Sequence, residues 1–357
     1  MNAADFFAAL AIPIIQPPMV GASSLTLSLA VARAGGLGSI AAGAMTPGEI
    51  EAEAAAFRAR SDAPFGVNLF VLRPAHPSPA VLDAALERLA PWYAALGLPS
   101  PGAPNDFAPD FEAQFAALLR AAPPLASFTF DRISADKVAA LRAAGSLVVG
   151  TATTVAEARA WAEVGADAIC AQGAEAGGHR GHFLAETDAS LVGTMALVGA
   201  VRAAVPLPVI AAGGIMDGRG VAAALALGAA AAQMGTAFLL ADEAATSAPW
   251  RAAIEAAADD PTRLTRAFSG RHARGVENRF MRELRPAEDD VPAYPVQNRL
   301  TGPLRAAAAA AGDAQMLSLW AGQGVKQARR GGAEAMVRIW WDEAKAASTA
   351  LAARTGG

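Results

Sequence analysis

The sequence has few charged residues, few lysines and a single cysteine, and each shortage excludes a class of protein. Charged residues make up 17% of the 357 residues and hydrophobic ones 54%, which indicates an ordered chain with a large core. The formal net charge of −4 gives no electrostatic basis for nucleic-acid binding, and lysine occurs only at positions 137, 326 and 345. Cys170 alone excludes an internal disulfide framework and is typical of a reducing compartment.

Segments that could enter a membrane are also missing. The longest uncharged run, residues 220–241, is mostly alanine and is interrupted by Gly228, Gln233 and Gly235. Because a spanning helix needs about 20 predominantly apolar residues, a buried helix followed by a buried strand explains the run better. The N-terminal MNAADFF has an acid where a signal peptide carries positive charge. We therefore expect a soluble, cytoplasmic protein with no membrane partner.

Short apolar runs alternate with helical patterns along the chain. Parallel strands that are buried on both faces have continuous apolar sequences. In this chain most of the short apolar runs precede a helical pattern. Helix starts carry capping patterns, such as Thr46 with Glu49 and Thr154 with Glu157. Eight such runs favour an α/β fold, a closed (β/α)8 TIM barrel, over a doubly wound sheet. The predicted strands are residues 12–19, 37–42, 64–71, 125–130, 146–153, 167–172, 208–214 and 231–238.

The pattern breaks in two places. Residues 72–124 are rich in proline and aromatics and contain one clear helix, near residues 80–96, while helices and loops without strands follow residue 242. We expect a barrel domain of residues 1–71 and 125–241, and a mainly helical second domain of residues 72–124 and 242–357. Because both extra segments leave the barrel at the same rim, we expect a lid over the mouth, with Trp320 facing the site.

Glycines lie at or near the ends of the last two predicted strands. In TIM barrels the active site lies at the C-terminal ends of the strands, and the loops after strands seven and eight often bind phosphate through backbone N–H groups. AAGGIMDGRG places Gly213 and Gly214 before a helix start near Asp217, and QMGT supplies Gly235 and Thr236. Since no P-loop or dinucleotide fingerprint follows the first strand, we expect bound FMN.

Three other residues end predicted strands at the same rim. Met19 ends the first strand, Asn68 lies near the end of the third, and Gln172 ends the sixth. We count Met19 among the flavin contacts, and both amides are placed to meet the edge of a flavin ring. Each amide alone could instead bond to loop backbone.

The loop EAGGHRG, residues 175–181, follows the sixth predicted strand. Gly177 and Gly178 would let the backbone pass close to a flavin. His179 could then act as a base or as a donor to a substrate anion near neutral pH. His182 is the local rival for this role. The remaining histidines, expected in loops or at the surface, are His76 and His272.

Several motifs together resemble the nitronate monooxygenases, formerly called 2-nitropropane dioxygenases. They are QPPM, AGGLGSIAAG, GVNLFV, AQGAEAGGHRG, VIAAGGI, QMGTAFL, SGRHARGVENRF and LWAGQG, and HPSPAVLDAALERLAPWYAALG resembles the main bacterial class. The resemblance implies an FMN-binding barrel with a helical second domain and no metal. It also implies oxidation of alkyl nitronates, such as propionate 3-nitronate, by O₂ to a carbonyl compound and nitrite, without reduced nicotinamide.

The resemblance also assigns residues by motif position. His179 would be the catalytic histidine. The FMN contacts would be Asn68, Gln172, Gly177, Gly214, Gln233, Met234, Gly235 and Thr236. The expected partners are the small-molecule nitronate and O₂, and we expect a monomer or homodimer.

Three other functions share parts of this pattern. The flavin-dependent enoyl-acyl-carrier-protein reductases share the fold and the EAGGH loop and use NAD(P)H, but the proline-rich insertion and the GRHARGVENRF segment argue against them. The IMP dehydrogenase group needs a cysteine in the loop after strand six, whereas Cys170 lies within the strand. A non-enzymatic phosphate-binding barrel would leave the histidine loop unexplained.

Overall fold

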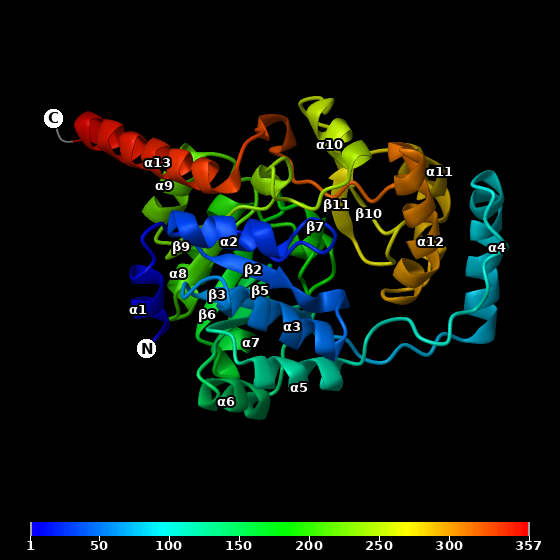
Figure 1. Cartoon of the computed structure of the whole chain (residues 1–357), viewed down its shortest axis with the longest axis horizontal. Helices are drawn as coiled ribbons and strands as arrows, with labels where there is room; N and C mark the ends of the chain where they lie inside the picture. The colour runs from blue at the N-terminus through cyan, green and yellow to red at the C-terminus, as the bar shows by residue number, and fades with distance from the viewer. Residues whose placement is uncertain (1, 356–357) are drawn as a thin grey trace.

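Eight parallel strands form a closed barrel in the computed structural model, which describes residues 2–355 (Figure 1). The order is β1-β9-β8-β6-β5-β4-β3-β2, and a parallel bridge between Ile15 and Leu37 joins the two ends. This confirms the predicted (β/α)8 TIM barrel. The strands are β1 (Ile14–Ile15), β2 (Gly38–Ala41), β3 (Phe65–Phe70), β4 (Leu125–Thr129), β5 (Leu147–Ala152), β6 (Ala168–Gln172), β8 (Val209–Ala212) and β9 (Ala231–Gln233).

Helices surround the barrel, and local sequence fixes their ends. Ser24 caps α2, Gly35 ends it with φ of 98°, and Thr46 and Glu49 form the predicted capping box of α3. The expected box at Thr154 is only half formed, because the Glu157 carboxylate accepts from Thr153 and from the loop at residues 183–184 instead. The barrel helices are α2 (Leu25–Ala34), α3 (Pro47–Arg58), α5 (Phe111–Ala121), α6 (Ala135–Ala143), α7 (Val155–Glu163), α8 (Thr194–Ala204), α9 (Gly218–Ala226) and α13 (Ala333–Thr355).

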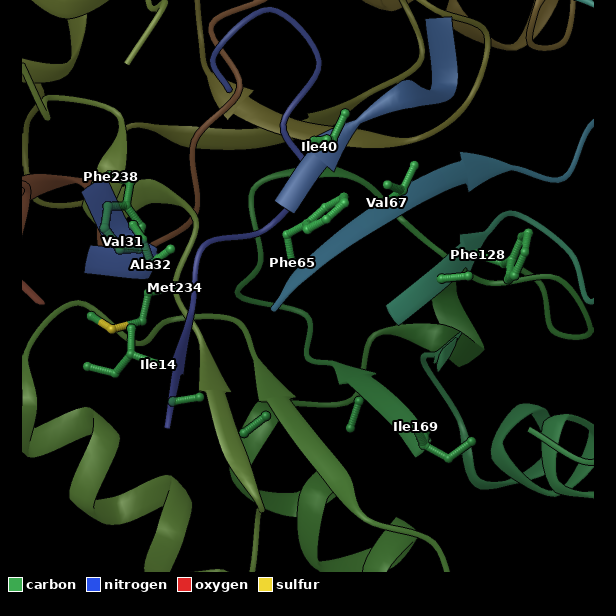
Figure 2. Packing of buried hydrophobic residues seen from close by; sticks show 14 of the residues in the cluster. Ile14, Val31, Ala32, Ile40, Phe65, Val67, Phe128, Ile169, Met234 and Phe238 are labelled. Carbon is green, nitrogen blue, oxygen red and sulfur yellow. The ribbon is translucent and has the colours of Figure 1, made fainter. Parts of the chain in front are cut away.

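Apolar side chains from strands and helices fill the layer between them. Ile14, Phe65, Phe128 and Met234 belong to this core, and Figure 2 shows them between the strands and the surrounding chain. At the N-terminal end of the barrel, Phe6 and Phe7 of α1 (Ala3–Ala8) pack on the first residues of several strands. Helix α1 therefore packs against the end of the barrel opposite the C-terminal ends of the strands.

A second core forms beside the barrel mouth. It contains Leu89 of the insertion and Phe268, Phe280 and Leu300 of the tail. The helices around it are α4 (Pro79–Ala95), α10 (Ala248–Glu255), α11 (Arg279–Leu284) and α12 (Val296–Ala311). Short 3₁₀ turns lie in both parts of the chain: η1 (Ala42–Ala44), η2 (Asp188–Ser190), η3 (Thr236–Phe238), η4 (Arg285–Asp290), η5 (Ala314–Met316) and η6 (Val325–Gln327).

Three features differ from the sequence prediction. The segment 72–124 holds two helices, and α5 packs on α3 in the barrel layer because its apolar face includes Phe115 and Leu118. The tail contains two strands, β10 (Thr262–Thr265) and β11 (Ala273–Val276). Its last helix, α13, returns to pack between α9 and α2, where it completes the helical ring (Figure 1). A division of the chain into two folding domains stays a prediction.

The long uncharged run forms α9, β9 and η3, which are the buried helix and strand predicted for it. Among residues 2–355, no helix has both the length and the apolar composition needed to cross a bilayer.

Candidate active site

A cavity of about 400 Å³ opens at the C-terminal end of the barrel strands. Tail residues such as Tyr294 and Trp320 form its other wall, so the tail covers the mouth as expected, whereas no described residue of the segment 72–124 lines the cavity. The cavity brings together almost all the predicted site residues. Those that line it are Met19, Asn68, Gln172, Gly177, Gly178, His179, Gly213, Gly214, Gln233, Gly235 and Thr236.

Met234 is the exception among the predicted flavin contacts. It is fully buried in the core between the barrel and its helices, as Figure 2 shows. Side chains alternate along a strand, so when Gln233 points into the barrel the side chain of Met234 points outward. We therefore withdraw Met234 as a side-chain contact of any ligand in the cavity.

The floor of the cavity is a polar layer on the inner faces of several barrel strands. Asn68 Nδ2 donates to Ser127 Oγ at 3.0 Å, and Gln233 Nε2 approaches Cys170 Sγ at 3.4 Å. Burial raises the pKa of the Cys170 thiol to about 12, so it stays protonated. A protonated Cys170 is a poor nucleophile, because the reactive form of cysteine is the thiolate.

Gln172 holds the loop that carries His179. Its Nε2 donates to the carbonyl of His179 at 3.0 Å, and its Oε1 accepts from the N–H of Gly181 at 2.8 Å. Both ends of the amide therefore bind backbone, which is the alternative that the sequence left open for it. Gln172 still lines the cavity.

The loop EAGGHRG continues a sheet that the tail provides. Gly178 and His179 form β7 (Gly178–His179), which pairs antiparallel with Arg274 and Ala273 of β11. The fully buried Arg180 guanidinium donates to the carbonyls of Gln172 and Gly173 and to that of Ser190 in η2. The loop is thus fixed on both sides and is not a free surface loop.

Close approach of the tail explains the glycine before β7. A Cβ on Gly177 would lie 2.5 Å from backbone atoms of Ala321 and Gly322. Gly178 has φ of 73°, a conformation that favours glycine, and the space beside its Cα is open. We expected both glycines to let the backbone pass close to a cofactor. At Gly177 the missing side chain instead makes room for the backbone of the tail.

A tail serine fixes the imidazole of His179. His179 Nε2 lies 2.8 Å from Ser269 Oγ, which itself donates to the carbonyl of Arg271 at 3.0 Å. Because the serine proton is used there, Nε2 carries the imidazole proton and donates to Ser269. The lone pair is then on Nδ1, which forms no hydrogen bond within residues 2–355.

Three aromatic rings surround this imidazole. The ring centres of Phe130, Tyr294 and Trp320 each lie 5.5 Å from that of His179. Burial, and then the charges of Arg271 and Arg305, lower the pKa of His179 to about 3. Burial also raises the pKa of Tyr294 to about 12, so both rings are neutral near pH 7.

The other histidines do not line the cavity. His182 Nε2 and His272 Nδ1 both approach Thr187 Oγ1, at 3.4 and 2.8 Å. His76 is exposed. Only His179 among the four is therefore placed to meet a ligand.

The glycine turns after β8 and β9 present free donors to the cavity. Gly213 and Gly214 have φ of 119° and 71°, and within residues 2–355 the N–H groups of Gly213, Gly214 and Gly235 donate to no acceptor. The start of α9 is different, since Asp217 and Glu343 accept its first N–H groups. An anion here would meet loop donors, and not the helix start that we expected.

These features fit a flavin mononucleotide. Free N–H groups at two glycine turns suit a phosphate, and the inner amides of Asn68 and Gln233 suit the polar edge of a ring. The cavity volume lies within the range of small-molecule sites.

Sequence reasoning predicted the tail lid and Trp320 but missed four other residues of the site. Ser269, Tyr294 and Arg305 all serve the cavity or its histidine, as does Phe130 after β4. The segment SGRHARG was recognised as a motif, but no local pattern shows that it pairs with the histidine loop.

Comparisons with known proteins agree with this geometry. The family model described as "Nitronate monooxygenase" matches residues 4–338. A "Probable nitronate monooxygenase" of Staphylococcus aureus (strain Newman) is 41% identical over 312 residues, which cover 87% of this chain and 88% of that protein.

Solved structures show the same relationship. Nitroalkane oxidase from Streptomyces ansochromogenes is 43% identical with a TM-score of 0.90, covering 97% of this chain and 99% of that one. FabK from Thermotoga maritima is 28% identical with a TM-score of 0.77, covering 99% of both chains. The family match over nearly the whole chain is decisive: the chain belongs to the nitronate monooxygenase family of flavin-dependent oxidoreductases.

Proposed function

We propose that this protein binds FMN and uses O₂ to oxidise alkyl nitronates to carbonyl compounds and nitrite. The observation that carries the proposal is the single cavity that joins unpaired glycine N–H groups at β8 and β9 to the Nδ1 lone pair of His179. Bound FMN would supply the electron acceptor. The similarity to nitroalkane oxidase supports a nitro compound or its anion as substrate.

His179 is the proposed catalytic residue. A neutral nitroalkane must lose its α-proton before oxidation, and Nδ1 is the free basic atom of this imidazole. The low pKa of His179 keeps that atom unprotonated near pH 7. A nitronate anion beside the ring would raise this pKa, because a negative charge favours the protonated form.

The other residues orient His179 and keep water away from it. Ser269 fixes the tautomer, Gln172 and β11 fix the backbone, and the rings of Tyr294 and Trp320 cover the imidazole. The Asn68 and Gln233 amides, together with the glycine turns, would hold the cofactor. Direct contact of Trp320 with the flavin is part of this proposal.

The flavin content and the electron acceptor test the proposal together. We expect yellow protein whose denatured supernatant contains FMN, and aerobic conversion of propionate 3-nitronate with release of nitrite. Recovery of FAD, or of no flavin after reconstitution, would contradict the cofactor. Rapid anaerobic bleaching of the flavin by NADPH would instead favour the reductase alternative.

A further inference from the structure

Arg305 of α12 carries the cavity's formal charge. Among the described side chains that line the cavity, no Asp, Glu or Lys occurs, and Arg305 is the one arginine. His179 is neutral near pH 7. A cavity whose lining holds one cation and no anion attracts negatively charged ligands.

The protein leaves this guanidinium incompletely paired. Nη2 donates to the carbonyl of Asn298 at 2.8 Å and to its Oδ1 at 3.0 Å, whereas Nε is buried and has no partner within residues 2–355. No Asp or Glu of the described chain forms an ion pair with it. Burial lowers the pKa of Arg305, yet a guanidinium stays protonated in proteins. A buried, unpaired charge is unfavourable. An anionic ligand that pairs with Arg305 therefore removes part of this free-energy cost, which favours its binding.

Arg305 lies across the barrel from the glycine turns. Its charge acts on His179 and Tyr294, and the Tyr294 ring packs on Phe70 of β3 and on Phe130 after β4. Gly213 and Gly235 follow β8 and β9, which lie on the opposite side of the closed sheet. If Arg305 binds an anion, that anion is therefore a second group and not a phosphate held by the glycine turns.

We propose that Arg305 is a specificity-determining residue that binds a carboxylate on the substrate, at the end remote from the carbon that reacts beside His179. The inference rests on the proposed function. A guanidinium binds a carboxylate through charge-assisted N–H donors, and Asn298, which binds Nη2, leaves Nη1 of Arg305 available as one. Nitronates with a carboxylate are then preferred over uncharged ones of the same shape.

Two nitronates of matched shape test this role. Propionate 3-nitronate and 3-methylbutyl-1-nitronate differ only in carrying a carboxylate or an isopropyl group. Loss of a charge-assisted hydrogen bond predicts that Arg305→Leu raises KM for the carboxylate about 10- to 100-fold, with KM for the isopropyl compound changed less than about threefold. Arg305→Lys should keep part of the preference.

Arg299→Leu is the matched control, because Arg299 is an exposed arginine on the same helix. It should change neither KM. A second readout uses malonate, a dicarboxylate that is not a nitronate. It should perturb the visible flavin spectrum of the wild type and of Arg299→Leu at concentrations that leave Arg305→Leu unaffected.

Three results would overturn the role of Arg305. The first is an equal change of KM for both nitronates in Arg305→Leu, and the second is no change of KM for either. The third is loss of bound flavin from this variant, which would indicate that Arg305 binds the FMN phosphate. Failure of the wild type to oxidise either nitronate would instead overturn the proposed function.

Discussion

The chemistry of His179 depends on atoms that lie far away in the sequence. Its neighbours in EAGGHRG set the backbone, but Ser269 decides which nitrogen carries the proton. With Nε2 engaged, Nδ1 is the atom that can accept a proton from substrate. His182, three residues further along, instead approaches Thr187 Oγ1 at 3.4 Å and does not line the cavity.

Replacement of His179 separates two substrate forms. General-base assistance contributes about 10²- to 10⁴-fold, and only the neutral nitroalkane needs it. We expect His179→Asn to lower kcat/KM for nitroethane by about that factor and to lower it far less for ethyl nitronate, with FMN still bound. Steady-state oxygen consumption measures both. His182→Asn is the control, and an equal or larger loss in that variant would contradict the assignment.

The same residue should make folding sensitive to acid. The unfolded imidazole binds a proton near its ordinary pKa of 6.5, whereas the folded one does so only near pH 3. The unfolded state therefore holds more protons between these values, and stability falls as pH decreases through this window. We expect the fall in Tm between pH 7 and pH 4.5 to be smaller in His179→Asn than in the wild type. Parallel Tm profiles would show that the buried imidazole has no such effect.

At the scale of elements, β7 joins the barrel to the tail. It follows β6 through a short turn and becomes the edge strand of the sheet β10-β11-β7 (Figure 1). The Arg180 guanidinium stabilises the turn between β6 and β7 because it donates hydrogen bonds to three backbone carbonyls. The histidine is thus placed where two substructures meet.

Loss of the Arg180 guanidinium should weaken this junction. Arg180→Met leaves buried carbonyls of Gln172, Gly173 and Ser190 without their donor, at a cost of about 2–4 kcal/mol in unfolding free energy. Urea unfolding measures this loss. Arg299→Met removes an exposed arginine and should stay within about 0.5 kcal/mol of the wild type. Equal stabilities of the two variants would rule out the stabilising role of Arg180.

Elements whose sequence carries a local signal were predictable. The barrel strands are continuous apolar runs, and the residues at their C-terminal ends meet at one rim in any TIM barrel, so the glycine turns and His179 could be predicted. β10 and β11 could not, because TRLT and ARGV contain arginines and show no apolar run. The returns of α5 and α13 to the barrel, and the places of Tyr294 and Arg305, depend on long-range packing that no local pattern encodes.

At the scale of the whole molecule, the cavity is the surface shared by the two cores. Barrel strands supply Asn68 and Gln233, and the tail supplies Tyr294 and Trp320. A ligand that fills the cavity contacts both cores at once. Its binding should therefore stabilise the junction as well as the barrel.

FMN and riboflavin together test this coupling and the phosphate site. A ligand present at 100 times its Kd stabilises the folded state by about 2.7 kcal/mol, so reconstitution with FMN should raise Tm and protect the segment 262–327 from proteolysis. Riboflavin has the same ring without the phosphate, so it cannot use the free N–H groups of Gly213, Gly214 and Gly235 and should raise Tm much less at equal concentration. Substitution of Gly214 is a poorer test, since its φ of 71° strains any other residue whether or not a phosphate binds. Equal stabilisation by the two flavins would exclude a phosphate site at these turns, and a protease-sensitive tail in the FMN-bound protein would exclude the coupling.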